Sequence, residues 1–264
     1  TSDEVVNSYI EVVRNYPDQV KWVDHALEKL VADQSAVDHV QRIENYRELI
    51  DKFPEVKKLG ARMTLEIARS FYQAGDLKNA ETEITTLSQV FAGEEEELAE
   101  AELLLVEVHV KRDDELRAIH QLKSIAEKYS ELKSGYYVIQ AKQRLLDLYL
   151  SSARRLRNAG DYELAIMRYR GAIDIQFHNV EAHRGQVFIM SRVGQLDNSI
   201  YYYSQQHEQS PDDEIIQYIL GLCYSYKATE LSEESNDISR LDISMLKKSN
   251  TMIEDALSRN YQLI

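Results

Sequence analysis

The sequence predicts an all-α fold, a solenoid in which helix–turn–helix units stack along one axis. A pattern of one turn residue, one small residue and then larger residues at helical spacing recurs along the chain, and its Gly160 and Gly194 copies stand 34 positions apart. Only nine Gly and three Pro occur among 264 residues, too few turn residues for a β-sandwich or barrel of this length. The composition, 44% hydrophobic and 29% charged, is that of a folded chain.

The second helix of each unit begins just after a turn residue. Four copies share the order of a turn residue, a small residue and two large or apolar residues: Gly75, Ala80, Ile84 and Leu87; Asp113, Ala118, Leu122 and Ile125; Gly160, Ala165, Tyr169 and Ala172; Gly194, Ser199, Tyr203 and Gln206. This spacing places the residues on one face of a helix, and the small residue lets a neighbouring helix approach closely.

The first helix of each unit precedes the turn and carries a matching stripe. Its members, three in each of four copies, are Ile67, Ala68 and Phe71; Ser152, Ala153 and Leu156; Gln186, Val187 and Met190; Leu220, Gly221 and Tyr224. Pro17, Pro54 and Pro211 stand where second helices should end, because proline cannot continue a helix.

These signals divide the chain into units of a single array that spans 1–264. The expected intervals are a half repeat at 1–19 and full units at 20–56, 61–94, 99–132, 135–179, 180–213 and 214–264. The stretch Ser130–Tyr137 is the one plausible joint within the array. Both ends look interrupted, since Asp3–Asn15 reads as a second helix without its first and Asn260–Ile264 as the start of another unit. We therefore expect a segment of a larger repeat protein.

The units resemble the tetratricopeptide repeat, a helix–turn–helix unit of 34 residues. The resemblance is strongest over 146–213 and weakest over 20–56 and 214–264. The tryptophan that the family places early in the first helix is replaced by Tyr149 and His183 in the two best copies. The resemblance implies a right-handed superhelix whose first helices line a concave face, where extended peptides usually bind.

The charge balance disfavours nucleic acid and anionic membrane surfaces as partners. The chain has 31 Lys and Arg against 45 Asp and Glu, a formal charge of −14, whereas binding to phosphates usually needs an excess of cations. No window approaches the roughly 18 apolar residues of a transmembrane helix. The single cysteine, Cys223, excludes an intrachain disulfide, and on an apolar helix it reads as a small buried hydrophobe rather than a reactive thiol.

The sequence lacks the motifs of common catalytic and cofactor sites, so we expect neither an enzyme nor a bound cofactor or metal. It contains no HExxH helix, no glycine-rich phosphate loop and no GxSxG elbow. His109 and His120 lie on consecutive helices near acidic residues, but packed or surface histidines explain them better than a metal site. The run Glu94–Glu97 reads as a solvated helix start in preference to an acidic docking patch. In Tyr201–Tyr203, Tyr203 takes a packing position while Tyr201 and Tyr202 need not, and the run favours packing between repeats over a ligand site.

Helical spacing also indicates which side chains of the first helices should face the concave groove that the resemblance implies. They are five arginines, four aromatics and three leucines, with no acid: Leu65, Arg69, Tyr72, Leu150, Arg154, Arg157, Arg184, Phe188, Arg192, Tyr218, Leu222 and Tyr226. Arginine offers a planar fork for carboxylates, and aromatics add rigid apolar area. Two interpretations stay open: these arginines bind a partner, or they brace neighbouring repeats through Asp and Glu.

The sequence therefore predicts a non-catalytic scaffold that binds an extended segment of another protein or peptide in its groove. The alternatives are a peptide- or ligand-sensing regulatory domain and the non-catalytic arm of a larger multidomain enzyme; the oligomeric state is left open. The groove lacks the Lys and Asn pattern of chaperone-binding family members, so a chaperone tail is not the expected partner. The stretch Asn45–Pro54 resembles bacterial envelope repeat proteins that act in outer-membrane assembly, which favours the periplasm slightly over the cytoplasm.

Overall fold

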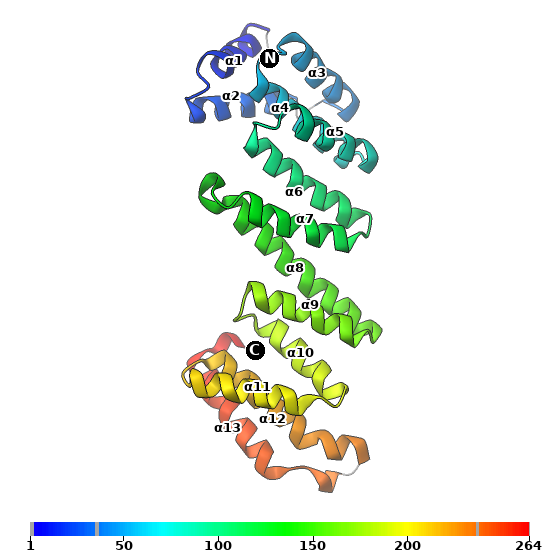
Figure 1. Cartoon of the computed structure of the whole chain (residues 1–264), viewed down its shortest axis with the longest axis vertical. Coiled ribbons are helices and arrows are strands. Elements are labelled where there is room, and N and C mark those ends of the chain that lie inside the picture. Colours follow the sequence, from blue (N-terminus) through cyan, green and yellow to red (C-terminus); the bar gives the residue numbers. More distant parts are fainter. Residues whose placement is uncertain (1–2, 35–36, 236–237, 264) are drawn as a thin grey trace. The chain divides into compact units, whose positions relative to one another are not determined.

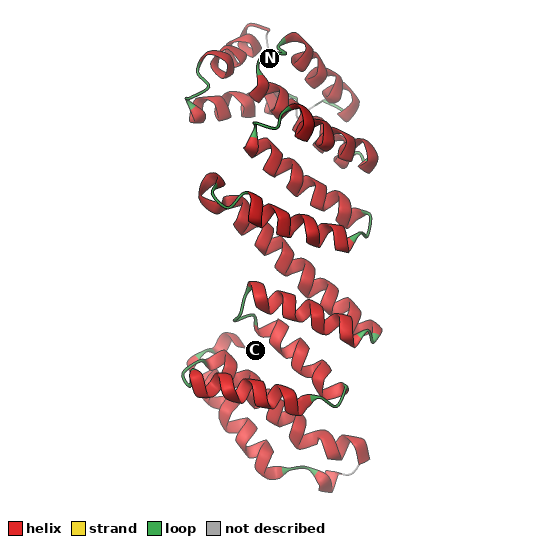
Figure 2. Cartoon of the chain, in the orientation of Figure 1, coloured by secondary structure: helices red, strands yellow, loops and turns green. Residues whose placement is uncertain are grey.

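The computed structural model describes residues 3–34, 37–235 and 238–263, and every regular element in them is helical (Figure 2). This described part contains thirteen α-helices and three short 3₁₀ helices. The all-α prediction is confirmed. None of these helices combines the length and the apolar character that crossing a membrane requires. Thr1 and Ile264, at the outer ends of the predicted array, lie outside the described residues.

The chain divides into two compact units, Thr1–Arg144 and Leu145–Ile264, and the division falls inside one long helix, α8 (Tyr136–Ala159). The helices that precede α8 (Figure 1) are α1 (Asp3–Asn15), α2 (Val20–Asp33), α3 (His39–Lys52), α4 (Lys57–Gln73), α5 (Leu77–Val90), α6 (Glu95–Lys111), α7 (Glu115–Lys128) and η1 (Leu132–Gly135). Those that follow it are α9 (Tyr162–Ile175), α10 (Val180–Arg192), α11 (Leu196–Gln209), α12 (Glu214–Ser235), η2 (Ile238–Arg240), α13 (Ile243–Arg259) and η3 (Tyr261–Leu263). The division lies C-terminal to the predicted joint at Ser130–Tyr137, and a single array over 1–264 stays a prediction.

Each unit packs helix against helix, because no helix pair can bury its apolar stripe alone. In the N-terminal unit, α4 contacts α3, α5 and α6, so its small and apolar residues are enclosed. Ala61, Leu65 and Ala68 of α4 are fully buried as a result. In the C-terminal unit, α12 holds a similar place among α10, α11 and α13.

Three glycines and one aspartate close the predicted turns with left-handed backbone. The φ angles are +81° at Gly75, +86° at Gly160, +69° at Gly194 and +57° at Asp113. In all four turns the N–H of the following residue donates to the carbonyl five positions earlier, each time at 2.9 Å. These bonds satisfy a carbonyl at the end of the first helix, which is the usual role of a left-handed residue there. The turn residues that the repeat pattern identified are confirmed.

Two close approaches between helices of the C-terminal unit are made by tyrosine rings over glycines. Tyr169 of α9 is fully buried with its ring against Gly185 of α10, where a Cβ would lie 2.2–2.5 Å from ring atoms. Tyr149 of α8 covers Gly171 of α9 in the same way, at 2.7–3.0 Å. Both positions need glycine because a larger residue would occupy the space of the ring.

The acidic run Glu94–Glu97 begins a helix, as the sequence predicted, but it is only partly solvated. Glu97 is only 4% exposed, and its carboxylate lies 3.0 Å from Lys58 Nζ. Glu96 lies 2.8 Å from Lys133 Nζ. Burial raises the pKa of Glu97, while Lys58 opposes that shift. The run therefore joins the start of α6 to α4 and η1 through ion pairs, a pairing that residue order along the chain does not reveal.

Gly185→Ala should lower the free energy of unfolding by about 1–3 kcal/mol, because the added methyl group would displace the Tyr169 ring. Denaturation by urea measures this change. Gly93→Ala is the matched control, since no atom lies within 4 Å of its added Cβ and its φ is not positive. Equal midpoints for the two variants would show that α9 and α10 do not approach as closely as described.

Asp113→Gly should raise the free energy of unfolding by about 0.5–1 kcal/mol, because glycine adopts left-handed backbone without a Cβ clash. The reciprocal change, Gly75→Ala, should lower it by a similar amount. The same denaturation experiment reports both. A loss of stability in Asp113→Gly would contradict the left-handed assignment of this turn.

Candidate functional site

Four of the predicted groove residues line one cavity of about 590 Å³ in the C-terminal unit, which we call the Phe188 pocket. Arg157 comes from the end of α8, Arg184 and Phe188 from α10, and Tyr226 from α12. The remaining lining residues are Val180, Glu181, Gly185, Gln262 and Leu263. The first helices of three repeats (α8, α10 and α12) and the segment after α13 therefore line the Phe188 pocket together.

The ring of Phe188 contacts two arginines and one tyrosine at this pocket. The guanidinium carbons of Arg157 and Arg192 lie 5.7 and 5.3 Å from the centre of its ring, within cation–π range. The Tyr226 ring meets Phe188 edge-to-face, with centroids 6.4 Å apart. Arg184 lies one helical turn before Phe188 on the same side of α10. The result is a cationic rim around an apolar centre.

Arg154 serves as a brace between two repeats. Its Nε lies 2.5 Å from Glu181 Oε1 and its Nη2 lies 3.3 Å from Oε2, so the guanidinium grips both carboxylate oxygens. This hydrogen bonding and the nearby negative charge raise the pKa of Arg154. The contact joins α8 to the first turn of α10. For this arginine the bracing interpretation fits the geometry.

Arg184 and Arg157 differ from Arg154, because neither has a carboxylate partner in the described part of the chain. Arg184 makes no hydrogen bond or ion pair there, and Arg157 donates to the side-chain oxygen of Asn158 at 3.4 Å. Burial raises the pKa of Tyr226 while the charge of Arg184 opposes the shift, which places that charge beside the pocket. The pocket therefore retains positive charge that the protein does not neutralise.

The hydroxyl of Tyr169 was not among the predicted site residues, yet it lies under the floor of the pocket. It is buried and has no hydrogen-bond partner in the described structure. The end of its ring abuts Gly185, a pocket residue. Burial raises the pKa of Tyr169 against the opposing charge of Arg157, so the group stays protonated and remains a donor. The repeat pattern marked Tyr169 only as a packing residue, and nothing in the sequence reveals an unpaired hydroxyl.

The first helices of the N-terminal unit show the opposite arrangement, a face closed by ion pairs. Arg69 of α4 lies 2.5 Å from Glu66 and also pairs with Glu100 of α6. Although burial disfavours its charge, these two acids raise the pKa of Arg69. Arg144 lies 2.6 Å from Glu107 in the same way. These arginines are already neutralised within their own unit.

Three predicted groove residues require a correction. Leu65, Leu150 and Tyr218 are exposed by only 0%, 7% and 6%, so they belong to the core and cannot present a surface to a partner. Leu222 is half-buried and packs against the core of the C-terminal unit, and Tyr72 is half-buried beneath a lysine ammonium 3.7 Å from its ring centre. Helical spacing identifies the face that a residue occupies, but the neighbouring helices decide how much of that face is covered.

The remaining candidates behave as packing residues. Cys223 is fully buried, and burial raises the pKa of its thiol to about 12, which matches the predicted hydrophobic role. Tyr203 is 2% exposed, whereas Tyr201 and Tyr202 are 67% and 44% exposed, also as predicted. No group of three or more His, Cys, Asp or Glu side chains within the described residues could hold a metal ion.

Comparisons with known proteins find likeness among solved structures. No family model and no curated protein matches the chain. YrrB, a tetratricopeptide protein described as having an unusual peptide-binding site, aligns over 83% of this chain and 99% of its own, at 17% identity and a TM-score of 0.33. The MamA protein aligns over 76% and 92%, at 14% identity and a TM-score of 0.34. The TPR2AB domain of yeast Sti1, in a complex with pHSP90, aligns over 87% and 99%, at 11% identity and a TM-score of 0.29.

The described residues fold into packed helix pairs that are similar to tetratricopeptide repeats. This assignment rests on their own geometry: two helices in each full unit, left-handed turns at the predicted positions, and small residues where neighbouring helices approach. Ala80, Ala118 and Ala165, the predicted small residues of three second helices, are all fully buried.

Arg154→Ala should lower the free energy of unfolding by about 0.2–1 kcal/mol, the usual range for an exposed ion pair, and the loss should shrink at high salt. Arg184→Ala should leave stability unchanged, because it breaks no ion pair. A double-mutant cycle with Glu181→Gln isolates the contact in the first case. A zero coupling energy between Arg154 and Glu181 at low salt would remove the bracing assignment.

Proposed function

We propose that the C-terminal unit is a non-catalytic interaction module that holds an extended, acidic segment of another protein in the Phe188 pocket. The observation that carries this proposal is the pair Arg157 and Arg184, two pocket cations without carboxylate partners. In a chain with a formal charge of −14, carboxylates are abundant, and Arg154 beside the pocket and Arg69 and Arg144 in the N-terminal unit each pair with one.

Charge supports an acidic partner segment over a neutral one. Guanidinium groups bind carboxylates through two parallel hydrogen bonds, and a pocket with positive charge attracts such groups from solution. A polyanion such as nucleic acid is disfavoured, because the acidic remainder of the chain would repel its long phosphate backbone.

The aromatic centre supports a peptide with an apolar side chain beside its acids. Phe188 and Tyr226 line the pocket while remaining only half-buried, so they offer apolar area to a ligand. Aromatic residues and arginines at the centre of an interface usually supply most of its binding energy. An acidic residue next to an aliphatic one would meet both features together.

Two alternative roles, a ligand-sensing domain and the non-catalytic arm of a larger enzyme, would use the same pocket. They differ from a scaffold in what partner binding leads to, and both remain open. A periplasmic location remains a prediction from the stretch Asn45–Pro54. Neither changes the chemistry expected of the partner segment.

A fluorescent peptide of alternating Glu and Leu tests the proposal by anisotropy, with the matching Gln and Leu peptide as its neutral counterpart. The acidic peptide should bind more tightly, and its affinity should fall as salt rises. Arg184→Ala and Phe188→Ala should each weaken binding by about 1–2 kcal/mol, the size of an interface hot spot.

Arg154→Ala is the matched control, because this arginine is already held by Glu181. It should change affinity little while slightly lowering stability. Equal affinities for the acidic and neutral peptides, or loss of binding in Arg154→Ala but not in Arg184→Ala, would refute the proposed site.

A further inference from the structure

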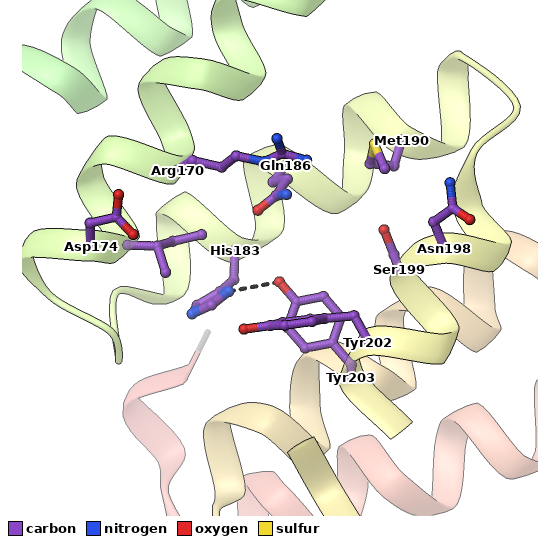
Figure 3. A pocket seen from close by; sticks show the side chains of 10 residues that line it. Arg170, Asp174, His183, Gln186, Met190, Asn198, Ser199, Tyr202 and Tyr203 are labelled. Atoms are coloured by element: carbon purple, nitrogen blue, oxygen red, sulfur yellow. Dashed lines mark hydrogen bonds between the residues drawn. The ribbon is translucent and has the colours of Figure 1, made fainter. Parts of the chain in front are cut away.

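A second cavity, of about 360 Å³, lies among α9, α10 and α11 (Figure 3). We call it the His183 cavity, and its lining residues are Arg170, Ile173, Asp174, His183, Gln186, Met190, Asn198, Ser199, Tyr202 and Tyr203. The α10 residues that line it are different from those of the Phe188 pocket, and helical spacing puts the two sets on opposite sides of α10. The two sites are therefore separate.

The floor of this cavity is a fixed chain of hydrogen bonds. His183 Nε2 lies 2.6 Å from the carbonyl oxygen of Phe177, which can only accept, so Nε2 carries the hydrogen. His183 Nδ1 then accepts from the hydroxyl of Tyr203 at 2.7 Å, the bond drawn in Figure 3. Burial lowers the pKa of His183, which keeps the imidazole neutral. Because the hydroxyl hydrogen of Tyr203 is donated to His183, the Tyr203 oxygen can act only as a hydrogen-bond acceptor toward a ligand in the cavity.

Several polar side chains around this floor have no partner of their own. Ser199 is only 6% exposed, yet its hydroxyl makes no hydrogen bond within the described part of the chain. The side chains of Gln186, Asn198, Arg170 and Asp174 likewise make no hydrogen bond or ion pair there. Arg170, Asp174 and Asn198 are exposed, so water can pair with them, and Gln186 is half-buried. Ser199 is buried, and because buried polar groups are nearly always satisfied, its unpaired hydroxyl beside the cavity indicates a ligand that would pair with it.

The chemistry of the lining narrows the ligand class. Arg170 and Asp174 carry opposite charges one helical turn apart without pairing to each other, which suits a ligand with both a carboxylate and an ammonium group. Met190 and Ile173 offer apolar surface beside them. The geometry points to a small zwitterion, a free α-amino acid with an aliphatic side chain or a dipeptide, as the occupant of the His183 cavity.

In this arrangement Arg170 binds the carboxylate, and Asp174 together with the Tyr203 oxygen receives hydrogens from the ammonium group. Gln186 and Ser199 supply further donors and acceptors to the ligand. The proposal rests on these residues alone and is independent of peptide binding in the Phe188 pocket.

Calorimetric titration with leucine, leucinamide and N-acetyl-leucine tests the assignment, because these three compounds differ chiefly in charge. Leucine should bind and raise the melting temperature. The amide, which lacks the carboxylate, and the acetyl compound, which lacks the ammonium, should each bind about ten-fold more weakly or worse.

Arg170→Gln should abolish the preference for leucine over leucinamide. Arg170 is exposed, so this variant should still fold. Lys123→Gln, at an exposed cation of the N-terminal unit, is the control and should bind leucine as the unchanged protein does. The proposal is overturned if leucine neither binds nor raises the melting temperature, if the three compounds bind equally, or if trileucine binds more tightly than leucine or dileucine.

Discussion

The contact of a tyrosine ring with a glycine backbone sets the spacing of the C-terminal unit. Because Tyr169 lies directly on Gly185, α9 and α10 approach more closely than any side chain at position 185 would allow. That approach fixes α10 in position, and α10 supplies residues to both hollows of the unit. Arg184 and Phe188 face one side, and His183 faces the other. Both candidate sites therefore depend on one packing contact.

Arginine has two roles in this fold, and its surroundings decide between them. Arg154 and Arg184 both lie on first helices of adjacent repeats, and the sequence pattern treats them alike. Arg154 pairs with Glu181 across the repeat boundary and braces the two repeats, whereas Arg184 pairs with no acid among the described residues. In the N-terminal unit, Arg69 and Arg144 act as braces as well. In the C-terminal unit, by contrast, Arg157, Arg170 and Arg184 have no carboxylate partner among the described residues, and the Phe188 pocket contains two of these three.

Much of the fold could be predicted from the sequence, because turns and helix stripes are local features. The left-handed residues Gly160 and Asp113 were both found from spacing, including the one that is not glycine. The candidate sites were harder to predict, since the exposure of each helix face depends on which neighbouring helices pack against it. Leu65 has the spacing of a groove residue but is covered by neighbouring helices. The unpaired hydroxyls of Tyr169 and Ser199 depend on distances between repeats, which no single repeat encodes.

The tyrosine–glycine contacts also bear on how such an array can change over evolutionary time. The ring of Tyr169 belongs to one repeat and the space at Gly185 to the next, so the two halves of the contact are encoded on either side of the unit boundary. A gene rearrangement that duplicated or exchanged a single repeat would separate a ring from its space. A gene segment that encodes both Tyr169 and Gly185 would preserve the contact, so we expect these neighbouring repeats to be duplicated or exchanged together.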